Sequence, residues 1–165
     1  MSRQDLGLSA NLAGLFSIRM LGIFLILPIY AEYMRDELGS GGFVTGLFIS
    51  SYALTQLIMQ PLVGALSDRI GRKITIVIGS ALFILGSLVI AFTSSAPIAI
   101  IGRVIQGAGA ISSVILALTS DIVREEIRGH TMAIIGIGIG VTFGVSVVLS
   151  QVLYRLGGGM AIFLT

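Results

Sequence analysis

Residues 64–73 read GALSDRIGRK, and the charges of this segment separate two long uncharged stretches. Neither residues 38–67 nor residues 74–102 contain an Asp, Glu, Lys or Arg. A helix needs about 20 mainly apolar residues to cross ~30 Å of hydrocarbon, and both stretches supply them. The segment therefore predicts a tight connection between two membrane-spanning helices, with its charges in the aqueous phase.

The composition of the whole chain supports a membrane protein. Of its 165 residues, 55% are hydrophobic and 11% are charged, and the mean hydropathy is +1.04. Soluble domains carry about 25% charged residues, and a soluble core of this size could not hide so much apolar surface. The net charge of +2 is too small and too dispersed for a nucleic-acid surface. With no Cys and one His, the sequence predicts no disulfide framework, no metal site and no cofactor.

The uncharged runs predict an all-α bundle with five membrane spans, at residues 9–31, 43–66, 74–93, 97–119 and 131–154. A further apolar run at residues 159–165 is expected to be an incomplete sixth span, because at 1.5 Å per residue it reaches only about 9 Å. Arg19 lies inside the first span and costs about 2.5–3.5 kcal/mol on insertion. The apolar residues around it offset that cost.

The basic residues of the short loops predict the orientation of the chain. With the N-terminus in the cytoplasm, six of the ten Lys and Arg residues fall in inner segments and two in outer segments. The remaining two, Arg19 and Arg103, lie within spans. Tyr30, Tyr33 and Tyr154 then fall at the outer ends, where interfacial aromatic residues are expected. We expect a multi-pass protein of the inner or plasma membrane with a cytoplasmic N-terminus.

Three segments resemble motifs of one transporter family. The pattern G-x-x-x-D-R-x-G-R-K at residues 64–73 resembles motif A of the major facilitator superfamily. The sequence RVIQGAGA at residues 103–110 is similar to motif B, and Asp121 followed by EIRG at residues 126–129 is similar to the connection that the family has before span five. The resemblance covers essentially the whole chain. It implies the N-terminal half of a twelve-span carrier that works by alternating access.

The resemblance also implies roles for individual residues. In the family, motif A and the acidic end of span four form a cytoplasmic charge cluster that holds one access state. Here that gating role falls on Gly64, Asp68, Arg69, Gly71, Arg72, Lys73, Asp121 and Arg128. The motif B arginine is linked in the family to proton coupling, and it corresponds to Arg103.

The chemistry of the spans points to a polar cavity as well. An arginine within the bilayer is a functional candidate because its exposure to lipid is costly. We therefore expect a cavity that contains Arg19, Gln56, Arg103, Gln106, Gly107 and Gly109. Hydrogen bonding between helices is the alternative role for the glutamines. No Asp or Glu lies inside a predicted span, so the sequence identifies no proton-carrying acid.

Gly136, Gly140 and Gly144 recur at every fourth position of the fifth predicted span. Small residues at this spacing allow helices in a membrane to approach closely. We expect this face to pack within the bundle, and a dimer seam is the alternative. The same glycines resemble motif C of drug-exporting members of the family, although its Gly-Pro is missing. The pattern therefore favours efflux without identifying a substrate.

The sequence predicts a transporter and not an enzyme, because it has no paired carboxylates and no Gly-x-Ser-x-Gly string, and His130 lies at a loop edge. We expect proton-coupled transport of a small organic solute. A twelve-span carrier needs on the order of 400 residues, so a missing C-terminal half or second chain is an expected partner, beside the lipid bilayer, the solute and protons. The alternative is a truncated, non-transporting membrane protein, or a scaffold that self-associates through its glycine-rich helices.

Overall fold

The structure, a computed structural model, describes residues 3–164, which form only helices and their connections. The elements are α1 (Arg3–Phe24), α2 (Tyr30–Glu32), the π-helical η1 (Tyr33–Glu37), α3 (Gly42–Ile70), α4 (Arg72–Ala91), α5 (Ala96–Ala108), α6 (Ser112–Ile122) and α7 (Glu125–Phe163). Five segments are long and apolar enough to cross a membrane: Asp5–Phe24, Gly42–Ile70, Arg72–Ala91, Ala96–Ile122 and Glu125–Phe163. The predicted all-α membrane bundle is confirmed.

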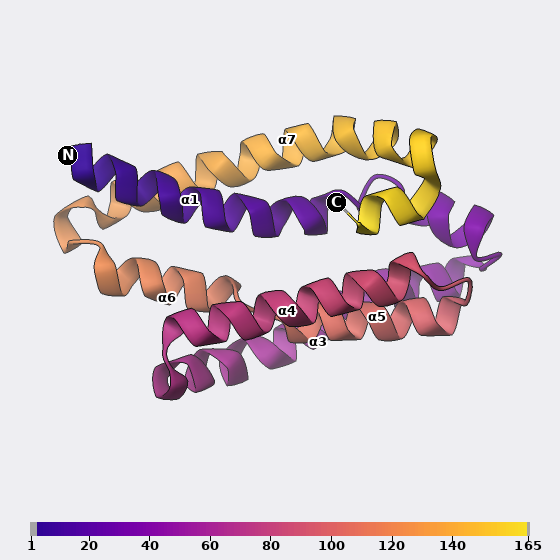
Figure 1. The fold of residues 1–165 in the computed structure, drawn as a ribbon, viewed down its shortest axis with the longest axis horizontal. Coiled ribbons are helices and arrows are strands. Elements are labelled where there is room, and N and C mark those ends of the chain that lie inside the picture. Colours follow the sequence, from indigo (N-terminus) through magenta and orange to yellow (C-terminus); the bar gives the residue numbers. More distant parts are fainter. Residues whose placement is uncertain (1–2, 165) are drawn as a thin grey trace.

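The long helices form two layers (Figure 1). In one layer α1 lies along α7, and in the other α5 packs against both α3 and α4. Helix α6 contacts α1 and α7 as well as α3 and α4, and so connects the layers. Two apolar clusters fill the interior. One is centred on Leu12, Phe16 and Ile115, and the other on Leu25 and Phe48.

The helix of the first span ends at Phe24, whereas the predicted span reaches residue 31. Proline explains the difference. Pro28 has no N–H to donate to the carbonyl of Phe24, and its ring disfavours a helical residue before it. The chain instead turns over residues 25–29, where Leu27 and Ile29 donate to the carbonyls three residues back at 3.2 and 3.1 Å.

The fourth predicted span is interrupted between α5 and α6. The amide of Gly109 bonds the carbonyl of Gln106 at 3.2 Å, and the amide of Ile111 bonds the carbonyl of Gly109 at 2.9 Å. These tight turns replace the regular helical ladder over residues 109–111. The interruption turns the carbonyl of Gly109 out of the ladder, where a side chain can reach it.

Helix α7 contains a kink near its end. Gly157 and Gly158 have non-helical torsions, and Gly158 has φ 62°, which favours glycine. After the kink the chain folds back between the two layers (Figure 1). Glu37 accepts a hydrogen bond from the amide of Gly159 at 2.6 Å and so anchors the segment. The predicted incomplete sixth span begins at this kink, and its last residue, Thr165, lies outside the described residues.

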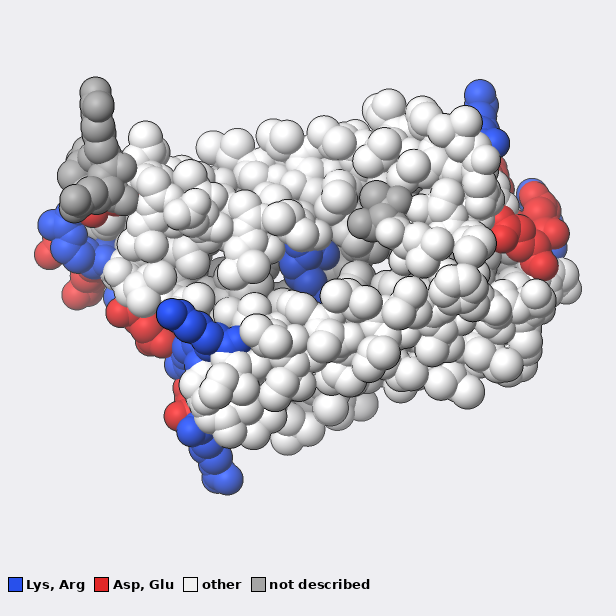
Figure 2. Space-filling view, viewed as in Figure 1, with Lys and Arg blue, Asp and Glu red and all other residues white. Residues whose placement is uncertain are grey.

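Most charged residues gather at the two ends of the long axis, and the apolar belt between them shows one basic patch in this view (Figure 2). The start of α1, the α3–α4 connection and the α6–α7 connection share one end (Figure 1). All three predicted inner segments thus lie on one side of the belt. That arrangement suits a bundle that spans a membrane, because charges are costly within its hydrocarbon.

Candidate functional site

The connection between α3 and α4 is a single residue, Gly71, with φ 95° and ψ 146°. Its amide bonds the carbonyl of Ser67 at 3.1 Å and closes the last turn of α3. A side chain at this φ would be strained, so glycine is required for the chain to reverse within one residue. The tight connection predicted between the two spans is thus a one-residue reversal at Gly71.

Arg72 is the centre of the charge cluster at this end of the bundle. Its Nη1 lies 2.6 Å from Oδ1 of Asp68, and its Nε lies 3.0 Å from Oδ2 of Asp121. Nη1 also donates to the hydroxyl of the buried Ser67. One guanidinium therefore joins the end of α3, the start of α4 and the end of α6. We call Arg72, Asp68, Asp121 and Ser67 the arginine clasp.

The other predicted gating residues lie around the clasp without joining it. Arg69 and Lys73 are exposed and form no ion pair within the described part of the chain. Arg128 donates to the backbone carbonyl of Ser120 at 2.9 Å and not to either aspartate. A Cβ added to Gly64 would approach only the hydroxyl of Ser113, at 4.0 Å. The sequence suggested Asp121 as a partner but not Ser67.

A second ion pair at the same end was not predicted. Nη2 of Arg124, at the start of α7, lies 2.7 Å from Oδ2 of Asp5 in α1. One turn further into the bundle, the hydroxyls of Ser9 and Thr131 share a hydrogen bond of 2.8 Å. The residues are more than 100 positions apart, so no local sequence pattern could have paired them.

Arg103 is sealed inside the layer of α3, α4 and α5, where only 1% of it is exposed. Its Nη1 donates to Oε1 of Gln106 at 2.9 Å, and Nε2 of Gln106 donates to Oγ of Ser87 at 2.7 Å. The guanidinium carbon lies 4.9 Å from the ring centroid of Phe48 and 5.1 Å from that of Tyr52. Neutral acceptors and aromatic faces thus surround a charge that faces no carboxylate.

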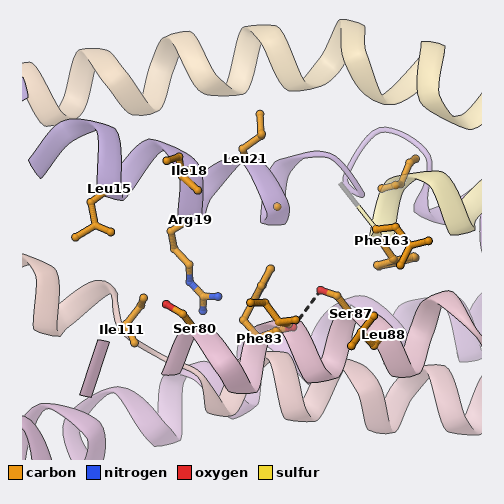
Figure 3. A pocket seen from close by; sticks show the side chains of 14 residues that line it. Leu15, Ile18, Arg19, Leu21, Ser80, Phe83, Ser87, Leu88, Ile111 and Phe163 are labelled. Carbon is orange, nitrogen blue, oxygen red and sulfur yellow. Dashed lines mark hydrogen bonds between the residues drawn. The ribbon is translucent and has the colours of Figure 1, made fainter. Parts of the chain in front are cut away.

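Arg19 extends from α1 across the space between the layers, toward Ser80 and Phe83 of α4 (Figure 3). Its Nη2 donates at 2.7 Å to the carbonyl of Gly109, which lies in the break between α5 and α6 and also accepts from the amide of Ile111. The guanidinium carbon stacks 4.1 Å from the ring centroid of Phe83. The Nε and Nη1 atoms are buried and have no hydrogen-bond partner in the described structure.

The structure separates the two arginines rather than joining them in one cavity. Gly107 and Gly109 lie at helix crossings: a Cβ on Gly107 would meet the carbonyl of Tyr52 at 2.7 Å, and one on Gly109 would overlap the carbonyl of Gly79. Gln106 bonds within its own layer, and Gln56 is half-buried beside Gly107. Of this set, Arg19 lines the cavity between α1 and α4, and the described residues do not bring the other members to that cavity, so the shared polar cavity stays a prediction.

The predicted packing of Gly136, Gly140 and Gly144 within this chain is also wrong. A Cβ added to any of the three would meet no atom within 4 Å. The close contact between α1 and α7 occurs instead at Gly138, where a Cβ would lie 2.8 Å from Oγ of Ser17. Gly138 is on a different face of α7, and glycine spacing alone could not show which face meets a neighbour.

The sequence profile of the Major Facilitator Superfamily matches residues 12–165. The chain belongs to this family. The fold accords with the match, since major facilitator halves are bundles of membrane-spanning helices. Three members of the arginine clasp, Ser67, Asp68 and Arg72, lie in residues 64–73, which resemble motif A, and Asp121 lies at the end of α6; Arg103 lies in the segment that resembles motif B.

Curated relatives in this family are transporters. The chain is 42% identical over 153 residues to the inner membrane transport protein YajR of Escherichia coli, matching 93% of this chain and 34% of YajR. It is 42% identical over 159 residues to a transporter of Buchnera aphidicola, matching 96% of this chain and 41% of that protein. It is 32% identical over 142 residues to the quinolone resistance protein NorA of Staphylococcus aureus, matching 82% of this chain and 36% of NorA. The chain thus spans between a third and about two fifths of the length of these relatives.

Proposed function

We propose that this chain is the N-terminal part of a carrier that exports a small organic solute by alternating access, coupled to protons, with its N-terminus in the cytoplasm. The observation that supports this most is the arginine clasp, because Arg72 holds three helix ends together through one side chain. The family of the chain and its named relatives support transport in general, and the name of NorA supports efflux.

The clasp is suited to opening and closing. The side chains of Asp68 and Asp121 are 63% and 52% exposed, while that of Arg72 is 22% exposed. Partly exposed ion pairs contribute about 1 kcal/mol or less each. Several such contacts favour one arrangement of α3, α4 and α6 without locking it. We expect the end of α6 to separate from Arg72 when the inner side opens.

In the proposed mechanism the embedded arginines supply fixed positive charge. A guanidinium does not deprotonate in proteins, so neither Arg19 nor Arg103 carries the transported proton. A titrating acid is required elsewhere in the complete carrier. Arg103, held by Gln106 inside its layer, would bias such an acid toward its ionised form.

Cysteine accessibility tests the clasp in the longest open reading frame that contains these residues. The 165 residues include no Cys, so Thr119→Cys, at a fully buried position near the end of α6, gives a single reporter here. We expect Asp121→Asn to raise labelling of this cysteine by a membrane-impermeant maleimide several-fold from the inner side. Unchanged labelling would refute the proposed role of the clasp in closing the inner side.

Asp36→Asn is the matched control, because it makes the same chemical change at the opposite end. Asp36 lies 2.7 Å from Arg35, and the hydrogen bond from that guanidinium holds the pKa of Asp36 below its usual range. Asp36 is thus ionised at neutral pH, and the variant removes a carboxylate from an ion pair at the opposite end of the bundle. We expect no change in labelling at position 119.

Export is tested by norfloxacin accumulation in cells that express the same open reading frame. We expect less drug to accumulate than in cells without it, and dissipation of the proton gradient to remove the difference. Equal accumulation in both would count against export of quinolones. If the difference in norfloxacin accumulation remains after the proton gradient is dissipated, this would count against proton coupling.

The open face of α7 favours a second candidate function, a self-associating membrane scaffold. Gly136, Gly140 and Gly144 present a face that no other helix of the described chain covers, and such a face can form a helix dimer. Detergent-corrected sedimentation of the 165-residue chain would then show a dimer that Gly140→Leu dissociates. A monomer would exclude the scaffold.

A further inference from the structure

Glycines bring helices α4 and α5 close together beside Ser87. A Cβ added to Gly86 would lie 2.6 Å from the carbonyl oxygen of Gly102, and one added to Gly102 would lie 2.9 Å from the carbonyl oxygen of Gly86. Small residues allow this separation of the two backbones. Ser87 follows Gly86 in the sequence, so its short side chain reaches the side chain of Gln106 across the contact.

A chain of hydrogen bonds leads from α4 to the guanidinium of Arg103. The hydroxyl of Ser87 donates to the carbonyl of Phe83, one turn earlier in the helix, at 3.0 Å (Figure 3). The same oxygen accepts from Nε2 of Gln106 at 2.7 Å, and Oε1 of Gln106 accepts from Nη1 of Arg103 at 2.9 Å. The three side chains are buried, since Ser87 is 9% exposed and Gln106 and Arg103 are 1% exposed each.

These bonds determine which end of the Gln106 carboxamide faces Arg103. A glutamine amide has an acceptor oxygen on one side and a donor NH₂ on the other, whereas a guanidinium has only donors. Because the hydroxyl of Ser87 donates to Phe83, its lone pairs face Gln106 and accept from the NH₂ end. The acceptor oxygen is thereby turned toward the guanidinium. A carboxamide rotated by about 180° would place donors against donors.

We propose that Ser87 is a positioning residue for Arg103. It acts through the carboxamide of Gln106, and so keeps the guanidinium between the rings of Phe48 and Tyr52. Every contact in this argument is formed between α3, α4 and α5. The inference that this positioning serves transport rests on the proposed function of the chain; the positioning itself does not.

Nitrogen NMR of the guanidinium tests this in the longest open reading frame that contains these residues. The protein is labelled with ¹⁵N-arginine and reconstituted in lipid nanodiscs, and the signals of Arg103 are those that Arg103→Lys removes. Rotation about the Nε–Cζ bond exchanges Nη1 with Nη2, and it requires the bond to Gln106 to break. We expect Ser87→Ala to raise the rotation rate about threefold, a factor that one average hydrogen bond between membrane helices accounts for.

Ser146→Ala is the matched control. The hydroxyl of Ser146 is also buried and also donates to a carbonyl four residues earlier, that of Thr142 at 2.7 Å, but it belongs to α7. We expect the rotation rate of Arg103 to stay unchanged in this variant. Ser87→Thr keeps a hydroxyl, and threonine in a helix can bond the same carbonyl. Rotation of Arg103 should therefore remain slow in Ser87→Thr.

A double-mutant cycle shows whether Ser87 acts through Gln106. Gln106→Met removes the carboxamide at similar volume and should itself raise the rotation rate. If Ser87 acts only by orienting that carboxamide, Ser87→Ala adds nothing in the Gln106→Met background. Looser packing of α4 on α5 would instead raise the rate in both backgrounds. Such additive effects would overturn the proposal, as would an unchanged rate in Ser87→Ala or an equal rise in Ser146→Ala.

Norfloxacin accumulation in cells that express the same variants separates this inference from the proposed function. We expect Ser87→Ala to weaken export and Ser146→Ala to leave it unchanged. If the rotation rate rises in Ser87→Ala and export is unchanged, Ser87 positions Arg103, and the role proposed for Arg103 in transport is wrong. If export falls and the rotation rate is unchanged, the positioning proposal is wrong and the transport proposal stands.

Discussion

Arg103 and Arg19 are both buried arginines in membrane spans, yet their surroundings differ. Arg103 lies within one helix layer, 1% exposed, with Gln106 and two aromatic rings around its guanidinium. Arg19 lies between the layers, 7% exposed, with two nitrogens unpaired beside a cavity. Arg103 completes a packed layer, and Arg19 joins the two layers through the carbonyl of Gly109. The Nε of each guanidinium is buried without a hydrogen-bond partner in the described structure, so unpaired nitrogens do not distinguish the two arginines; their place within a layer or between the layers does.

Replacing each arginine by methionine is expected to show the largest difference. Arg103→Met removes a charge-assisted hydrogen bond and leaves Oε1 of Gln106 buried without its donor, at a cost of about 3 kcal/mol. Arg19→Met removes a charge that is only partly paired, and such replacements are often close to neutral. We expect Arg19→Met to change stability by about 1 kcal/mol or less.

Reversible unfolding in mixed dodecyl maltoside and SDS micelles, followed by circular dichroism, measures both variants. Equal destabilisation would show that Arg19 is structural like Arg103.

Glycine substitutions should change stability by an intermediate amount, and they compare the packed layer around Arg103 with the open face of α7. A Cβ on Gly86 would lie 2.6 Å from the carbonyl oxygen of Gly102 in the layer that encloses Arg103. Backbone atoms cannot move aside easily, so Gly86→Ala should cost about 2 kcal/mol. Gly140→Ala, on the open face of α7, should be neutral or slightly stabilising. The same unfolding assay compares them, and similar losses for both would mean that the face of Gly140 is covered.

The smallest expected effect concerns the α1–α7 layer that carries Arg19. Thr131→Val removes the hydrogen bond to Ser9, but the hydroxyl of Ser9 keeps its bond to the carbonyl of Asp5 at 2.9 Å. Hydrogen bonds between membrane helices contribute about 0.6 kcal/mol on average, so we expect a loss of that size. Thr142→Val is the control, because its hydroxyl bonds only the carbonyl of Gly138 in its own helix. If Thr131→Val lowered the free energy of unfolding more than Arg103→Met does, the polar contacts of the α1–α7 layer would contribute more to stability than those around Arg103.

The broad architecture could be predicted from hydropathy, because uncharged runs of span length have few alternatives to membrane helices. The charges of residues 64–73 also predicted a tight connection there, and Gly71 provides it because its backbone adopts a positive φ. The early end of α1 could also have been predicted from the sequence, because Pro28 cannot donate to the carbonyl of Phe24. The break at residues 109–111 was not, since glycine and alanine both occur in unbroken membrane helices.

Contacts between distant segments explain why the candidate site was predicted only in part. Motif spacing brought Arg72 to Asp68 and Asp121, but it also included Arg69 and Arg128, which the fold directs elsewhere. The role of Arg19 depends on Phe83 and on the carbonyl of Gly109, and both lie more than 60 residues away. Such pairings depend on how helices rotate against one another, which no single-helix pattern contains.

The gap between α5 and α6 has a dynamic consequence. With the regular ladder replaced by two short turns at residues 109–111, this span is joined there by fewer backbone bonds than elsewhere, and Arg19 braces the gap through the carbonyl of Gly109. A molecule that draws the guanidinium away would remove that brace. Helices α5 and α6 could then rotate relative to each other about residue 110. In hydrogen–deuterium exchange, the amides of residues 109–111 would exchange before those of α5 and α6.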